Sequence, residues 1–553
     1  MNPDIREEII DKYNKGKSFI DQQGIVENTR KNWRFYLGDQ WYGLETGGEV
    51  LPQYNVIKPT LKYKITTVCQ NKMSVTYSDL QAQDKNVEIF KAMNIKVASN
   101  WEKADMSSIL FKVIKEAGIS GDSYTFWYEP NKCQQIDNVS IILGDEQNSN
   151  IQEQPWIIIR ERVNVSDVIE VAKANHVPEE EWSSITADKD NDYQLDKDTE
   201  VDGGSTDGKC LSLIYMTKET EKDADGKETS TVWVGRCTKN CMYQPMTAIR
   251  YSQGEVAKRG LTMYPIVNFV WEDKPNSARG YSEVEQLIPN QIQINRLLAQ
   301  RAIAIKQCAF PKLAYDVTAV NNPEDIDTIG ASIQLNGNAQ AINSMITYLS
   351  PAGLNGEGTA LNGEMVKTTR ELAGASENIL GQIDPTRVAA SAIAALQEQS
   401  ASILNEQVAK FEKYIEDTAR LWWELDIVYN DTVETQDTDG NPIKVTPDEM
   451  SKLQPEVRID VSQDTAFTKE SALVRMDKLL EMQQITVEEW AKLLPQNSPL
   501  PKDDLLRILQ ERQQQMPPEE EQPMQAEPIP QEQLPLEERM ALQEGGEYGM
   551  PEM

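Results

Sequence analysis

The 553-residue sequence has one histidine and six scattered cysteines, so several kinds of site are excluded at the start. His176 lies in KANHVPEEEW with no cysteine or aspartate arranged around it, which favours a surface or capping residue over a catalytic base. With a single histidine, a zinc site of the usual kind is excluded. The cysteines do not form a disulfide framework, and their use fits a reducing compartment.

Long apolar runs are also missing. No stretch of about 18 apolar residues occurs, so we expect no transmembrane helix. The first residues, MNPDIREEIIDKYNKGKS, are charged and lack an apolar core, so they do not predict a secretory signal. Apolar residues still make up 39% of the chain, with eleven tryptophans, enough for real cores. The length predicts about three or four domain-sized units.

Positive charge is scarce. Lysine and arginine total 55 against 88 aspartates and glutamates, for a net charge of −33. A protein that grips duplex DNA needs a basic footprint, because neutralising phosphates supplies most non-specific affinity. The balance therefore excludes tight DNA binding. It leaves two interpretations open: simple solubility, or a surface past which DNA slides with little friction.

Two motifs imitate ligand sites without completing them. GKS at 16–18 resembles the end of a P-loop, but the first glycine of that motif would fall at Asp11, and no strand precedes it. The acidic stretch DKDNDYQLDKDTE, which starts at Asp188, resembles half an EF-hand. Its sixth and twelfth positions are Tyr193 and Thr199, where that loop needs glycine and glutamate. We therefore expect no nucleotide site at 16–18, and we expect the acidic stretch to be a solvated loop.

Catalytic groups do not assemble either. Cys237 and Cys241 have the wrong spacing for a CxxC pair, and no Ser-His-Asp set can be built from one histidine. Paired carboxylates are so frequent in this acidic chain that none is informative. The sequence therefore predicts that the protein is not an enzyme and holds no cofactor or metal.

The first half of the chain predicts an α+β arrangement. Residues 4–36 and 86–118 have helical periodicity, and Pro59 is suited to the first turn of another helix. Strands with mostly antiparallel connections are predicted for SYTFWYE, PWIIIRERV, VSDVIEV, CLSLIYMTK, STVWVGRC and YPIVNFVWE.

The second half is dominated by long helices. We predict a helix over 282–310 with Ser282 as its N-cap, short strands and turns over 311–350, and a second helix from Thr359 to Asn378. A very long helix follows at 391–429. We then predict a hairpin around DTDGNP within 430–462, with Val457, Ile459 and Val461 alternating on its return strand, and two amphipathic stretches after it. From Met516 the Pro-, Glu- and Gln-rich tail has little to bury and is predicted to be disordered.

A marked break separates the second helix from the very long one. It contains Gly381, Asp384 and Pro385, which supply backbone freedom and a turn. From the residues alone, an ordinary turn between helices and a loop with a function both remain open.

This order resembles the portal family of tailed double-stranded DNA bacteriophages. The resemblance covers roughly residues 25–490 and depends on the order and spacing of several stretches. Those stretches are FYLGDQWY, YNVIKP, AGISGDSYTFWY, YPIVNFVWEDKPNSARGYSEVEQLIPNQIQINRLLAQ and AGASENILGQIDPTRVAASAIAALQ.

The resemblance implies a portal fold with an α/β wing, a long helical stem, a small β-containing clip and a helical crown, assembling as a ring. Its regions would be the wing at 1–280, the first stem helix at 281–310, the clip at 311–355, the second stem helix at 356–378, the tunnel loop at 379–389, a long wing and crown helix at 390–429, wing strands at 430–463, the crown at 464–515 and an acidic disordered tail at 516–553.

The resemblance also implies a function and partners. Twelve subunits would form a ring at one capsid vertex, the channel for DNA packaging and ejection. Partners would be double-stranded DNA, the large terminase, head–tail connector proteins, and the major capsid and scaffold proteins, with no membrane. The protein would reside in the virion, and in the host cytoplasm during assembly.

The resemblance points to residues near DNA. On the tunnel loop these are Gln382, Asp384, Thr386 and Arg387, with Arg387 offered to phosphates. On the stem the channel-facing candidates are Glu283, Gln286, Glu364 and Glu371. Trp422 and Trp423 either join the ring interface or lie in the wing core. Two other interpretations are a cytosolic helical scaffold or adaptor without a channel and, against the missing catalytic residues, a nucleic-acid enzyme.

Overall fold

The protein is described here by a computed structural model. It describes residues 3–42, 51–70, 72–79, 86–188, 208–222, 228–249, 260–309, 312–325, 332–336, 346–349, 357–374, 402–429, 433–436, 442–453, 455–462, 476–482, 484–487 and 490. The chain divides into two compact units, Met1–Asp464 and Thr465–Met553. In the second unit residues 476–481 are helical, and Trp490 Nε1 donates to Asp477 Oδ1 at 3.1 Å. The elements below belong to the first unit.

The N-terminal helical region is two helices, and the single helix predicted over 4–36 is wrong at Gly24. α1 (Pro3–Gln22) and α2 (Ile25–Leu37) meet at this glycine, whose φ of 66° is left-handed and cannot continue a right-handed helix. Gly16, the glycine of GKS, lies inside α1 against the side chain of Ile142, where a Cβ would clash. Its role here is close packing of a helix on a strand.

The helix predicted over 86–118 is also two helices. α4 (Val87–Lys103) ends before Asp105, whose φ of 49° is left-handed, and α5 (Met106–Ser120) begins after it. A non-glycine residue in this conformation is uncommon, and the apolar periodicity runs on through the break, so the pattern did not indicate it.

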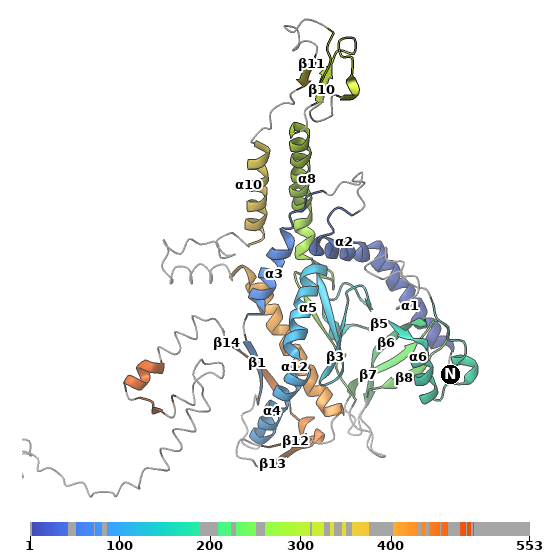
Figure 1. The fold of residues 1–553 in the computed structure, drawn as a ribbon. Helices are drawn as coiled ribbons and strands as arrows, with labels where there is room; N and C mark the ends of the chain where they lie inside the picture. The colour runs from blue at the N-terminus through green and yellow to red at the C-terminus, as the bar shows by residue number, and fades with distance from the viewer. Residues whose placement is uncertain are drawn as a thin grey trace, which may run out of the picture. The chain divides into compact units, whose positions relative to one another are not determined.

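Two antiparallel sheets follow α5 (Figure 1). The three-stranded sheet has the order β3-β2-β9 and the five-stranded sheet runs from β4 to β8 in sequence order. Their strands are β2 (Asp122–Glu129), β3 (Lys132–Ile136), β4 (Ile141–Leu143), β5 (Trp156–Asn164), β6 (Lys209–Lys222), β7 (Glu228–Cys237), β8 (Gln244–Ala248) and β9 (Ile266–Val270).

One predicted strand is a helix. β5 ends at Asn164, and the VSDVIEV segment forms α6 (Val165–Ala174), which buries Val168 and Ala172. Their spacing of four residues is helical, and the β-branched composition misled the prediction. His176 follows this helix with a left-handed φ of 57° and is exposed, which confirms the predicted surface or capping role.

Segments that are far apart in the sequence pair with each other in the first unit. α3 (Ile57–Val68) holds Pro59 in its first turn, and β1 (Lys72–Asp79) pairs antiparallel with β14 (Pro455–Ser462). A hairpin forms around the predicted DTDGNP turn from β12 (Val433–Gln436) and β13 (Pro442–Val445). The predicted return strand is wrong, because Val457, Ile459 and Val461 lie on β14 and pair with β1. The short helices are η2 (Ile151–Glu153), α7 (Glu179–Trp182), η3 (Pro323–Asp325), η5 (Ser402–Leu404) and α13 (Pro447–Met450).

The main core gathers around α12 (Asn405–Tyr429). Trp422 and Trp423 are almost fully buried there. The ring of Trp422 meets that of Trp127 edge-on at 5.2 Å between centroids, and Trp423 meets Tyr77 at the same distance. Of the two alternatives left open by the sequence, the structure therefore favours the core: both tryptophans are buried within a single copy. Residues 391–401 of the predicted long helix lie outside the described residues.

Within the described ranges, none of the helices combines the length and the apolarity needed to cross a bilayer.

Candidate functional site: the two-helix stem

The helix predicted over 282–310 begins where the sequence predicts. α8 (Glu283–Ala309) has 27 residues and therefore spans about 40 Å. The Ser282 hydroxyl oxygen accepts hydrogen bonds from the backbone N–H groups of Val284 at 3.0 Å and Glu285 at 3.4 Å, and its O–H donates to the Ile119 carbonyl at 2.6 Å. The predicted N-cap is confirmed.

Just before this cap, Arg279 ties together the segments that support α8. Its guanidinium contacts the carboxylates of Glu146 at 2.8 Å and Asp122 at 3.6 Å, and donates to the Asn138 and Ile141 carbonyls. Burial raises the pKa of Asp122, and the Arg279 charge opposes that rise. The next residue, Gly280, passes so close to the Gly121 carbonyl that a Cβ would clash.

Glu283, predicted to face a channel, is buried instead. Its Oε1 lies 2.7 Å from Lys64 Nζ of α3, and its Oε2 accepts from Trp271 Nε1 at 3.2 Å. Both charged side chains are almost completely buried. A buried carboxylate is stabilised only with such a partner, and this one anchors the base of α8 to α3. Periodicity within α8 could not show that a lysine more than 200 residues away lies opposite it.

Two buried amides fix the next turns of α8. Gln291 Oε1 accepts from the Val56 N–H at 2.9 Å, and its Nε2 donates to the Tyr54 carbonyl at 2.6 Å. Asn295 Oδ1 accepts from the Tyr54 N–H at 3.1 Å, and its Nδ2 donates to Gln40 Oε1 at 2.6 Å. Sequence reasoning missed these residues; the signal was their polar character inside an apolar helix stripe. They pair the otherwise unsatisfied backbone of YNVIKP, which is what buried polar groups require.

Beyond Ala299 the side chains of α8 become largely exposed. α10 (Glu357–Leu372) lies beside α8, and residues on both helices stay uncovered (Figure 1). Ile303 is 42% exposed, Leu361 50% and Leu372 74%. Large apolar side chains gathered on one such element are typical of a surface that another molecule covers.

A small antiparallel pair of strands lies between α8 and α10 in the sequence. β10 (Lys312–Tyr315) pairs with β11 (Ile346–Leu349), with Lys312 opposite Leu349. Asn321 and Asn336 exchange side-chain hydrogen bonds between the described residues that separate the two strands. The sequence from 328 to 356 contains no charged residue, in contrast with the chain as a whole.

The other predicted site residues fall into two groups. Gln286 on α8 and Glu364 and Glu371 on α10 are exposed, and Glu371 forms a 3.8 Å ion pair with Lys367. The tunnel-loop residues lie outside the described residues; they are Gln382, Asp384, Thr386 and Arg387.

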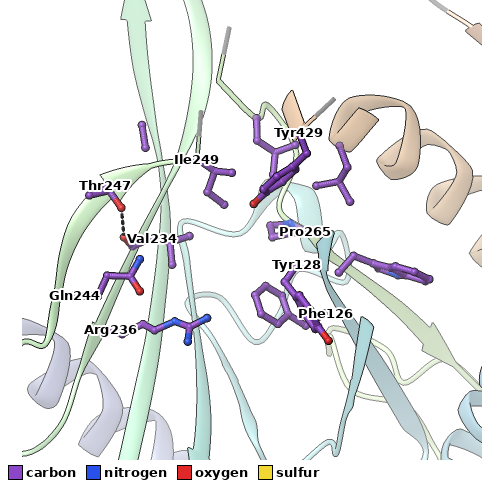
Figure 2. Close-up of a pocket in the computed structure, with 13 residues that line it drawn as sticks. Phe126, Tyr128, Val234, Arg236, Gln244, Thr247, Ile249, Pro265 and Tyr429 are labelled. Carbon is purple, nitrogen blue, oxygen red and sulfur yellow. Dashed lines mark hydrogen bonds between the residues drawn. The ribbon is translucent and has the colours of Figure 1, made fainter. Parts of the chain in front are cut away.

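A concave site elsewhere in the first unit has no catalytic group in its lining. A pocket of about 240 Å³ lies between β7, β8 and β2, with Arg236, Gln244 and Thr247 on one side and Phe126 and Tyr128 on the other (Figure 2). The described residues that line it include no carboxylate, cysteine or histidine. Across the described part of the chain, no three His, Cys, Asp or Glu side chains gather in a cluster that could hold a metal ion.

Comparison with known proteins assigns the chain to a family. Residues 246–547, more than half of the chain, match the family model of the Phage P22-like portal protein. The chain therefore belongs to the P22-like portal protein family. That family is structural rather than enzymatic, and the matched region begins within β8 and includes both α8 and α10.

Solved structures give weaker similarities. A chain from the virion of a native gene transfer agent particle is 11% identical with a TM-score of 0.38, over 84% of this chain and 93% of that chain. A chain from the neck of an empty gene transfer agent particle is 10% identical with a TM-score of 0.36, over 80% of this chain and 90% of that chain. The assignment depends on the family model and not on these values. No curated protein matches the sequence.

Proposed function

We propose that the protein forms a ring of twelve copies at one capsid vertex and that double-stranded DNA passes through the ring during packaging and ejection. The observation that carries this proposal is the stem. The stem lies within the matched region of this portal-family chain. Its apolar side chains, such as Ile303 and Leu361, are not covered within a single copy. A head-to-tail ring closes by covering such surfaces with the neighbouring copy.

The regions of the chain then take distinct roles. Residues 1–280 and 430–463 form the wing, α8 and α10 form the stem, and 311–355 form the clip that contacts the large terminase and later the head–tail connector proteins. Residues 379–389 form the tunnel loop, with Arg387 near phosphate, and 464–515 form the crown. The wing faces the major capsid and scaffold proteins, and the ring resides in the virion after assembly in the host cytoplasm.

The mechanism is passive. The chain supplies a wall, and the ATP-driven step belongs to the terminase, since GKS at 16–18 lies within α1 and cradles no phosphate. Gln286, Glu364 and Glu371 remain candidates for the wall because they are exposed. Glu283 is not, because its carboxylate is held by Lys64.

A complementation experiment tests the proposal. Virus lacking this gene is supplied with the full chain or with a chain in which 311–355 is replaced by a short Gly-Ser linker. The full chain restores filled heads. The linker variant is expected to form rings and empty heads, since the stem is intact and the terminase site is lost. Filled heads without any copy of this protein would refute the portal proposal, and filled heads with the linker variant would refute the clip assignment.

The alternative, a cytosolic helical adaptor without a channel, predicts a different result. The chain would then stay monomeric or dimeric at every salt concentration, and heads would fill in its absence.

A further inference from the structure

Lysines gather on one side of three helices that pack together, α2, α3 and α5 (Figure 1). Lys58 Nζ lies 5.9 Å from the centroid of the Tyr36 ring, and Lys115 Nζ lies 5.7 Å from the same centroid. Lys62 is one helical turn beyond Lys58, and Lys112 is three residues before Lys115, so both lie beside this pair. Lys58, Lys62 and Lys112 are exposed.

Two exposed apolar side chains border these lysines. Leu37 follows Trp33 by four residues, so the two share a side of α2. Phe111 precedes Lys115 by four residues and shares its side of α5. Lys115 Nζ lies 5.4 Å from the centroid of the Trp33 ring, which joins the two sides. Leu37 is 63% exposed and Phe111 41%. We call Lys58, Lys62, Lys112 and Lys115, with Leu37 and Phe111, the basic face.

The basic face is an exception in an acidic protein. From 50 to 78 the sequence has four lysines and no aspartate or glutamate, although the whole chain has 88 of these acidic residues. The one carboxylate of α5, that of Glu116, is buried. Within the described part of the chain, none of the three exposed lysines forms an ion pair. The face therefore presents positive charge that a single copy does not neutralise.

The chemistry and the position of the face both indicate what covers it. Exposed lysines next to exposed apolar side chains fit an acidic protein surface. α2, α3 and α5 each pack against α8, so the face flanks the buried half of that helix. In the proposed ring the stems of neighbouring copies meet around a hole, and surfaces at the base of α8 then lie close to the next copy. That copy offers acidic surface, since its net charge is −33.

We propose that the basic face contacts an acidic surface of the neighbouring copy and that this attraction helps to close the ring. The inference rests on the proposed function and names one interface of the ring. Charge also decides the symmetry of the contact. A two-fold dimer through this face would place lysines opposite lysines, whereas a head-to-tail contact places them opposite carboxylates. Because copies of net charge −33 repel one another overall, a local attraction of this kind favours rings over two-fold pairs.

Crosslinking of purified rings tests the contact. Rings are assembled from equal amounts of unlabelled and heavy-isotope-labelled chain and treated with a carbodiimide. This reagent takes up one water molecule as it joins a lysine amine to a contacting carboxylate in an amide bond. We expect crosslinked peptides that pair Lys58, Lys62 or Lys112 of one isotope with an aspartate or glutamate of the other. Crosslinks from these lysines that stay within one isotope, or none at all, would overturn the inference.

Charge reversal measures how much the contact contributes. The double variant Lys58→Glu, Lys112→Glu is compared with Lys173→Glu, Lys452→Glu, which makes the same change in net charge outside the face. All four lysines are exposed, so the free energy of unfolding should stay unchanged. At about 0.1 M salt, ring assembly followed by mass photometry should weaken about tenfold for the face variant and less than about twofold for the control. The difference should shrink at about 1 M salt, where exposed charges interact over only about 3 Å.

The failure of this inference is distinguishable from failure of the proposed function. Normal ring assembly by the face variant, or equal weakening in the control, would overturn the inference and leave the portal function intact. Normal rings of the face variant that lose DNA, or that fail to enter heads, would overturn it in favour of a face that contacts DNA or the capsid. An unchanged chain that never forms rings would contradict the proposed function itself.

Discussion

The two halves of α8 differ in where their partners come from. The half nearest Ser282 is held by its own chain, through the ion pair between Glu283 and Lys64 and the amides of Gln291 and Asn295. The half beyond Ala299 has α10 beside it and still exposes Ile303 and Ile305. One helix thus passes from the core of the folded unit to a surface that a single copy leaves exposed. Substitutions in the first half should change stability, and those in the second should change assembly.

The largest effect is expected for Lys64→Met. This change leaves the Glu283 carboxylate buried without its cation, which should lower the free energy of unfolding by about 3–5 kcal/mol. Chemical denaturation of the unassembled chain measures it. Adding Glu283→Gln should recover much of the loss, because the unpaired charge is then gone. A single variant as stable as the double variant would show that the ion pair does not anchor the helix.

The next largest effect is expected for Ile288→Ala in the buried half of α8. Ile288 is part of the main core, and truncating it should cost about 2–5 kcal/mol through lost burial and the cavity left behind. The same denaturation measurement applies. A loss below about 0.5 kcal/mol would mean that this half of α8 is not packed as described.

A pH-dependent effect is expected at Glu116 of α5, a helix that packs beside α8. Burial raises the pKa of this carboxyl to about 7 from 4.5, although Ser120 and the Trp33 indole hydrogen bond to it. The folded protein therefore binds a proton more tightly than the unfolded chain. This contribution to stability is full below pH 4.5 and is lost as pH rises towards 7, by at most about 3 kcal/mol.

Glu116→Gln should flatten that decline. Unfolding free energies of both proteins, measured between pH 4.5 and 8, make the comparison, and their difference should grow in favour of the variant with rising pH. Two parallel pH profiles would show that Glu116 titrates normally.

The smallest effect on stability is expected for Ile303→Ala, which makes the same chemical change as Ile288→Ala, fifteen residues further along α8. Because Ile303 is exposed in a single copy, the free energy of unfolding should change by less than about 0.5 kcal/mol. Ring assembly, followed by mass photometry, should instead weaken several-fold. Similar losses in the free energy of unfolding for Ile288→Ala and Ile303→Ala would contradict the distinction between the two halves of α8.

The sequence predicted those parts of the fold that depend on local pattern. The helix expected over 282–310 is Glu283–Ala309, its cap is Ser282, and the hairpin around DTDGNP is present. The predictions from local pattern were wrong where the backbone conformation of a single residue ends a helix. Gly24 and Asp105 adopt left-handed φ values inside continuous apolar periodicity, so two helices stand where one was predicted in each case.

The candidate site was harder to predict, because it depends on contacts between distant residues. Periodicity marks which side of α8 is polar, but it cannot show that Glu283 is paired with Lys64 or that Gln291 satisfies the backbone at Tyr54 and Val56.

Electron microscopy of the purified chain tests the central claim most directly. A reconstruction should show closed rings of α8 and α10 around an open central hole, with α8 and α10 of adjacent copies in contact through Ile303 and Leu361. Particles that remain single copies at all salt concentrations, or rings in which the stem helices point away from the central hole, would contradict it.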